Sequence, residues 1–145
     1  MSKLTQVDLD KVEYIADTYF KKLGLDIEFT KHFLDRVNDE RNKKQITVDE
    51  LNALFKSIYI KYKYNLTELN QDYNGVFKDI WTDINSPFVI NYDYKENDIN
   101  IVLKTIMRKK NFKTTNKFYT VNTNENLIFE SFTTFFKSTN IKKII

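Results

Sequence analysis

The sequence predicts an α+β domain in which N-terminal helices pack on one face of a four- to five-stranded antiparallel sheet. Two observations support this fold class. Apolar residues recur every three or four positions in the first half of the chain, and at every second position from residue 76 onward. Helices followed by consecutive strands are typical of α+β proteins. At 145 residues we expect one domain, with a helical part over 1–64, a sheet over 76–122 and a C-terminal segment over 123–145.

The first two predicted helices differ in length. The first covers about residues 8–23, where an apolar stripe ends at Gly24, a residue suited to a left-handed helix cap. The second is short. Thr30 is placed to cap it, Phe29 and Leu34 are placed for a hydrophobic staple, and the helix ends near Arg41, before a polar run.

The third helix has the clearest start signal. Thr47 and Glu50 match the S/T-x-x-E capping box, in which each side chain bonds the other residue's backbone N–H. Apolar residues then repeat with helical spacing, so one face of this helix should enter the core. These residues are Leu51, Leu54, Phe55, Ile58 and Tyr62.

The second half of the chain alternates between apolar and polar residues, after a turn signal at Asn74-Gly75. The segment from Leu127 to Phe136 fits a helix and a strand equally well, and both remain open. The predicted strands, with the hairpin turn between the second and the third, are Val76–Ile84, Phe88–Tyr94, the turn Lys95–Asp98, Ile99–Lys109 and Phe118–Val121.

Composition excludes several classes of protein. Cysteine is absent and histidine occurs once, which excludes disulfides, thiolate zinc sites and a cysteine nucleophile. The carboxylates follow no calcium-loop order, and no phosphate-binding or dinucleotide-binding glycine motif occurs, so we expect neither metal nor cofactor. No apolar run approaches the roughly 18 residues of a membrane span, and we expect a soluble, intracellular protein without a membrane partner.

Two segments carry residues suited to phosphate chemistry. On a helix, His32 and Arg36 share one face, and an imidazole beside a guanidinium can transfer a proton and stabilise phosphorane charge. The same spacing also suits a solvated helix face on which nearby carboxylates form ordinary ion pairs.

The second segment, Ile99–Asn124, contains six cations and no acid. Lys104 and Arg108 would project from one strand face roughly 13 Å apart at ~3.3 Å per residue, a span suited to successive phosphates. A lysine-rich edge strand that discourages aggregation is the alternative. The aromatic residues that could stack on bases are Phe112, Phe118 and Tyr119.

Three stretches together resemble the barnase/EndoU/colicin/RelE-like nucleases (the BECR fold), and their phage-type members most. The residues Lys31–Arg41 (KHFLDRVNDER), followed by Ile46–Leu51 (ITVDEL), are similar to the H-x-x-x-R…R…I-T-x-E-x-L pattern of that family. The stretch Leu103–Lys113 (LKTIMRKKNFK) is similar to a late strand of the phage group. The resemblance covers about residues 29–121, although the link from Arg41 to Thr47 is longer here than in related sequences.

The resemblance implies an RNase-like protein that cleaves RNA without a metal, through attack of the 2′-hydroxyl on the adjacent phosphate. It implies catalytic roles for His32, Arg36 and Lys104, and RNA contacts for Arg41, Thr105 and Arg108. The basic segment itself adds Lys109, Lys110 and Lys113 as candidate contacts to a nucleic acid. With a single histidine, the second proton-transfer group would be Glu40, Lys104 or a tyrosine.

The alternative is a noncatalytic phage virion component or host-takeover interaction protein with the same fold. It would use the basic surface for RNA, another polyanion or a protein partner. Either protein would act in the cytoplasm of an infected bacterium or be packaged in a virion.

Overall fold

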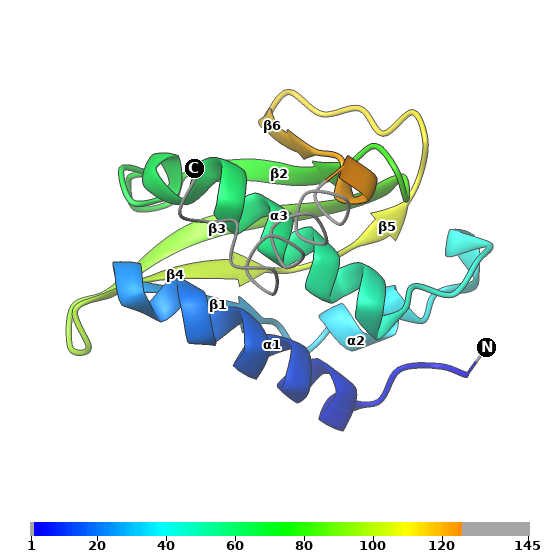
Figure 1. Ribbon diagram of the computed structural model, residues 1–145, viewed down its shortest axis with the longest axis horizontal. Helices are drawn as coiled ribbons and strands as arrows, with labels where there is room; N and C mark the ends of the chain where they lie inside the picture. The colour runs from blue at the N-terminus through cyan, green and yellow to red at the C-terminus, as the bar shows by residue number, and fades with distance from the viewer. Residues whose placement is uncertain (1, 126–145) are drawn as a thin grey trace, which may run out of the picture.

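The computed structural model describes residues 2–125, and within them the predicted α+β class is confirmed (Figure 1). Two long helices, α1 and α3, pack against each other on one face of a six-stranded sheet. The helical elements are α1 (Gln6–Phe20), η1 (Lys21–Leu23), α2 (Phe33–Val37), η2 (Glu40–Asn42) and α3 (Val48–Leu66). The strands are β1 (Leu25–Phe29), β2 (Asn74–Asp79), β3 (Ile84–Asp93), β4 (Asp98–Leu103), β5 (Met107–Arg108) and β6 (Lys117–Val121).

The predicted ends of the long helices are confirmed. Gly24 closes η1 in the left-handed region, with φ of 71°, which glycine adopts without a side-chain clash. Glu50 N–H donates to the Thr47 hydroxyl (3.1 Å), and the Thr47 N–H donates to the Glu50 carboxylate (3.0 Å), so the capping box at the start of α3 is complete.

The short helix α2 begins differently from the prediction. Thr30 does not cap it, because its hydroxyl donates to the Lys104 carbonyl oxygen (3.2 Å). The residue before α2 is His32, and its side chain makes no capping bond. Phe29 stacks on Phe33, with ring centroids 4.4 Å apart, and this contact fixes the start of α2.

The sheet is mixed, which corrects the predicted antiparallel sheet. Its strand order is β1-β4-β3-β2-β6, and β5 pairs with the start of β3. The central strands are antiparallel, but β1 runs parallel to β4 and β6 runs parallel to β2. The sequence pattern did not predict β1, since a five-residue alternating run directly after a helix is too short to stand out from the helical periodicity around it.

The predicted strand Val76–Ile84 is wrong, because a tight turn divides it. The buried Asp79 carboxylate accepts hydrogen bonds from the Trp81 N–H (3.1 Å) and the Thr82 hydroxyl (2.7 Å), and these bonds turn the chain back on itself. As a result β2 ends at Asp79 and β3 begins at Ile84. Apolar and polar residues keep alternating through the turn residues, although these are not in a strand. The alternation of the sequence therefore could not show where the turn lies.

The predicted strand Ile99–Lys109 is also divided, into β4 and β5. Between them, the Lys104 carbonyl accepts the Thr30 hydroxyl and the Thr105 carbonyl accepts the Ser86 hydroxyl (3.1 Å). These side chains take the place of ladder partners, and the chain leaves the sheet for three residues.

The interruption also explains how β3 contains the only proline of the chain. β3 pairs with β5 up to Asn85 and with β4 from Phe88 onward. Pro87 lies between these two ladders, so its missing N–H removes no bond on that side of the strand.

The core lies between the helices and the sheet. Phe77 stacks on Phe88 (4.2 Å between centroids), and the Tyr119 ring contacts both edge-on. Gly75, predicted to lie in a turn, is inside β2, where a Cβ atom would come within 2.6 Å of the Phe88 ring. Glycine is therefore required there by close approach rather than by a turn.

Two further predictions concern the ends of the chain and membranes. The helix-or-strand question at 127–136 lies outside the described residues. Within residues 2–125, no helix is long and apolar enough to cross a membrane.

Candidate functional site

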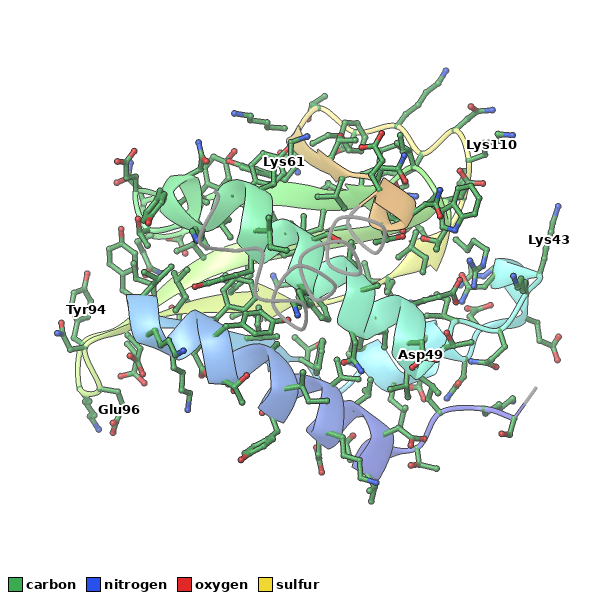
Figure 2. All side chains as sticks on the ribbon, viewed as in Figure 1. Lys43, Asp49, Lys61, Tyr94, Glu96 and Lys110 are labelled. Carbon is green, nitrogen blue, oxygen red and sulfur yellow. The ribbon has the colours of Figure 1, made fainter. Side chains whose placement is uncertain are left out.

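A cleft forms where two segments that are distant in the sequence meet at one end of the molecule. Figure 1 places α2 and β5 at this end, and Figure 2 shows the Lys43 and Lys110 side chains projecting there. The cleft has a volume of about 680 Å³. One wall consists of Arg36, Asp39 and residues 41–44, and the other consists of Asp83 and residues 105–110. We call it the cationic cleft.

The charge of the cleft is strongly one-sided. Its lining holds seven cationic side chains and two carboxylates, those of Asp39 and Asp83. A concave surface lined by one sign of charge focuses its potential and attracts ions of the opposite sign. The cations are Arg36, Arg41, Lys43, Lys44, Arg108, Lys109 and Lys110.

Asn42 connects the two walls. Its side chain is almost fully buried, at 4% exposure, and its Nδ2 donates to the Arg36 carbonyl (2.9 Å) and the Val37 carbonyl (3.2 Å). Its Oδ1 accepts the backbone N–H of Arg108 (2.9 Å). One amide therefore ties the end of α2 to β5 and sets the width of the cleft.

Arg108 is the second connection between the walls, and the sequence-based role for it in RNA binding does not fit this arrangement. Its guanidinium pairs with both Glu50 oxygens (2.8 and 3.0 Å). The remaining donors bond the carbonyls of Lys44 (3.3 Å), Gln45 (3.1 Å) and Thr82 (2.9 Å). All five guanidinium N–H groups thus have protein acceptors, and none is left for a phosphate.

Glu50 is the electrostatic partner of Arg108. The two side chains are only 18% and 12% exposed. Burial by itself raises the pKa of Glu50, but the hydrogen bonds from Arg108 and from the Thr47 backbone outweigh it and hold the pKa below its ordinary value. The carboxylate is therefore charged and belongs to the scaffold of the cleft.

Arg36 and Arg41 lie in the cleft as predicted, and both face Asp39. Arg41 donates to the Asp39 carboxylate through Nε (3.2 Å) and Nη2 (2.8 Å), and Arg36 approaches it at 3.8 Å. The hydrogen bonds from Arg41 lower the pKa of Asp39 to about 2. Both arginines are exposed, so they can exchange this carboxylate for a phosphate at small cost.

His32 and Lys104 lie outside the cleft lining. Both are exposed, and their chain segments adjoin, because the Thr30 N–H donates to the Leu103 carbonyl (3.1 Å) next to the Thr30–Lys104 bond. The imidazole is not sealed in the core. The structure brings the histidine segment and the late strand together, and both segments contribute to the cleft, but the His32 and Lys104 side chains are not part of its lining.

The sequence-predicted residues therefore divide into two groups. Within the lining are Arg36, Arg41, Thr105, Arg108, Lys109 and Lys110, and outside it are His32, Lys104 and the exposed Lys113. Sequence reasoning missed Asn42, Lys43, Lys44 and Asp83. The sequence shows Lys43 and Lys44 as two adjacent cations in the polar run after the short helix, a common arrangement at a helix end. Only the fold shows that they face β5 across the cleft.

The predicted stacking residues are also divided. Tyr119 is buried on the helix side of the sheet, where its hydroxyl bonds that of Tyr73 (2.8 Å), so it is not available to a base. Phe112 and Phe118 pack against each other edge-on at 6.2 Å, and Lys78 Nζ lies 5.3 Å from the Phe118 ring centre.

Within residues 2–125, no group of three or more histidine, cysteine, aspartate or glutamate residues is arranged to hold a metal ion. Comparison of the chain with protein-family models, with curated proteins and with solved structures found no match. The functional argument therefore depends on the cleft itself.

Proposed function

We propose that the protein binds RNA, with the sugar-phosphate backbone lying in the cationic cleft. The observation that carries this proposal is the excess of cations in one concave lining, where six cations besides the Glu50-paired Arg108 face two carboxylates. Lys43, Lys44 and Lys110 are exposed, and none forms a salt bridge with another described residue. Unpaired cations that converge on a hollow are arranged for a polyanion.

Phosphate neutralisation supplies the affinity in this proposal. Each phosphate that meets a lysine or arginine releases condensed counterions, and binding weakens steeply as salt rises. Lysines suit this task because an ammonium group accepts many phosphate geometries, whereas the arginines add bidentate contacts. Such contacts position a strand without reading its sequence.

A pair of matched variants tests the proposal. The cleft variant replaces Lys43, Lys44 and Lys110 by Gln, and the control variant replaces the exposed Lys11, Lys22 and Lys95. Both lose three positive charges. We expect the cleft variant to bind labelled RNA at least about tenfold more weakly than the control at low salt, measured by fluorescence anisotropy. Equal weakening in both variants would mean that net charge, and not the cleft, attracts RNA.

RNA cleavage is a second candidate function, favoured by the adjoining positions of the His32 and Lys104 segments. In this reaction the 2′-hydroxyl loses its proton to a base and attacks the adjacent phosphorus. The bond to the 5′-oxygen breaks, and that oxygen takes a proton from an acid. The products are a 2′,3′-cyclic phosphate and a 5′-hydroxyl, and the resemblance to BECR-fold nucleases supports the same chemistry.

Incubation of the protein with RNA in EDTA tests cleavage. We expect cyclic-phosphate ends from the wild type and their loss in His32→Ala and Lys104→Ala. Retained salt-sensitive binding without cleavage by the wild type would favour the noncatalytic alternative, a phage virion component or interaction protein.

A further inference from the structure

The turn between β2 and β3 carries the only tryptophan of the chain in an exposed position. Trp81 is 62% exposed, and the neighbouring Ile80 is 53% exposed. Large apolar side chains left in water at one place often mark a binding surface. The functions considered above give this indole no role.

The turn is fastened directly to the cationic cleft. Asp83 belongs to the cleft lining, and its carbonyl accepts the Lys109 N–H (2.9 Å). The Thr82 carbonyl accepts a guanidinium N–H of Arg108 (2.9 Å). Trp81 therefore stands two residues from the lining, on a backbone fixed by both bonds and by its own N–H bond to the Asp79 carboxylate.

We propose that Trp81 stacks on an unpaired base of a nucleic-acid strand whose phosphates lie in the cationic cleft. This inference rests on the proposed function and adds the substrate class, a single strand. A strand held by its phosphates can turn its bases outward, and the exposed indole two residues along the chain from the lining offers a flat apolar surface for one of them. The bases of an intact duplex are already stacked within it and cannot reach the ring.

The cations of the segment that the turn is bonded to favour a nucleic acid over an apolar protein partner. The residues after Trp81 bond the backbone of Lys109 and the guanidinium of Arg108, and a protein surface that extended from Trp81 onto this wall of the cleft would have to cover the lysine charges there, which is costly in an apolar interface. A single strand supplies both a ring for the indole and a charge for each lysine.

The fluorescence of the single tryptophan tests the inference on the full chain. Three probes are used: a short oligouridylate, an RNA duplex of equal length, and inorganic polyphosphate, which has charge and no bases. We expect oligouridylate to quench Trp81. Polyphosphate should compete for the cleft and leave the indole emission nearly unchanged, and the duplex should quench much less than the single strand.

Three variants measure the energy of the contact by anisotropy of a labelled oligouridylate. Trp81→Leu should bind it at least about fivefold more weakly, and Trp81→Phe should keep most of the affinity. Tyr94→Leu removes an aromatic ring that is 82% exposed at the opposite end of the molecule (Figure 2), and should bind like the wild type. Polyphosphate affinity should be the same in all four proteins.

The two proposals fail in different ways. If the cleft binds polyphosphate and RNA while Trp81→Leu keeps full affinity for oligouridylate, the stacking inference is wrong and the cleft proposal stands. If neither probe binds the wild type, both are wrong.

Discussion

Side chains of like charge cluster in two regions of this molecule, cations in the cationic cleft and carboxylates along α1 and β1, and the two clusters differ in how far their charges are exposed. In the cationic cleft, the lysines stay exposed and their charges remain available. On the edge formed by α1 and β1, five carboxylates gather, and the pKa of one of them is raised so far that it holds its proton up to near-neutral pH. The members of this acidic edge are Asp10, Glu13, Asp17, Asp26 and Glu28.

Asp17 shows how the acidic edge avoids repulsion. Its Oδ1 accepts the N–H of Ile27 in the edge strand β1 (3.1 Å), which holds the carboxyl half-buried. Burial, with the neighbouring Asp26 charge, raises the pKa of Asp17 to about 7. At the acidic edge the repulsion is thus relieved by proton uptake, whereas in the cleft the exposed lysines form no ion pair with another described residue. The two clusters differ more in the solvent exposure of their charged groups than in the number of charges.

The largest effect should come from the one charge pair that the cleft buries. Glu50→Gln leaves Arg108 facing a neutral amide, and we expect a loss of about 3 kcal/mol in the free energy of unfolding, measured in urea. Because folding lowers the pKa of Glu50, this stabilisation is present above the unfolded pKa and disappears as the pH falls through the folded one.

Asp49→Asn is the matched control for Glu50→Gln, since Asp49 is exposed in the same first turn of α3. It should cost no more than about 0.5 kcal/mol through the helix dipole. If both variants lose the same stability, the Glu50–Arg108 pair does not hold the walls together.

A smaller effect is expected at the acidic edge. The folded pKa of Asp17 lies above its unfolded value of 3.8, so the folded state binds the extra proton, and stability should fall as the pH rises from about 4 through 7. Asp17→Asn keeps the acceptor for Ile27 and removes the charge. At pH values above 7 it should be more stable than the wild type by on the order of 1 kcal/mol, after allowance for solvent screening.

Thermal unfolding across this pH range provides the measurement. Asp35→Asn, an exposed change on α2 outside the acidic edge, should leave the wild-type slope of stability against pH unchanged. If the stability of the wild type does not fall as the pH rises toward 7, Asp17 does not hold its proton in the folded state, and the difference drawn between the acidic edge and the cleft is wrong.

The smallest effect should come from the carboxylate within the cleft. Asp39→Asn frees Arg41 and Arg36, and RNA affinity should rise by about two- to fivefold at low salt. Asp35→Asn changes an exposed acid on α2 outside the lining and serves as the control. Unchanged or weaker binding by Asp39→Asn alone would show that the two arginines do not meet the ligand.

The parts of the fold that could be predicted are those whose signals are local. The capping box of Thr47 and Glu50 lies within four residues, and helical periodicity located α1 and α3. The break after β4 depends on a distant side chain, that of Thr30, which bonds Lys104. The turn at Asp79 combines local bonds from Trp81 and Thr82 with a distant one from Thr123 (2.7 Å), and the apolar-polar alternation that continues through it hid the local part.

The same distinction explains the site. The sequence indicated that a segment around Arg36 and a segment around Lys109 both carry residues suited to phosphate chemistry, and the fold places them on opposite walls of one cleft. The sequence could not indicate that every guanidinium N–H of Arg108 bonds Glu50 or a backbone carbonyl. These acceptors lie in three separate places, the loop after η2, α3 and the turn between β2 and β3. The role of His32 stays a prediction.

The salt dependence of RNA binding tests the central claim most directly. Plots of log affinity against log salt would be compared for the wild type, the variant lacking Lys43, Lys44 and Lys110, and the control lacking Lys11, Lys22 and Lys95. For a single strand each lost phosphate contact should lower the slope by about 0.7, so the cleft variant should be shallower by about 2 and the control unchanged. Identical slopes in the two variants would contradict the assignment of the cleft as the RNA-binding surface.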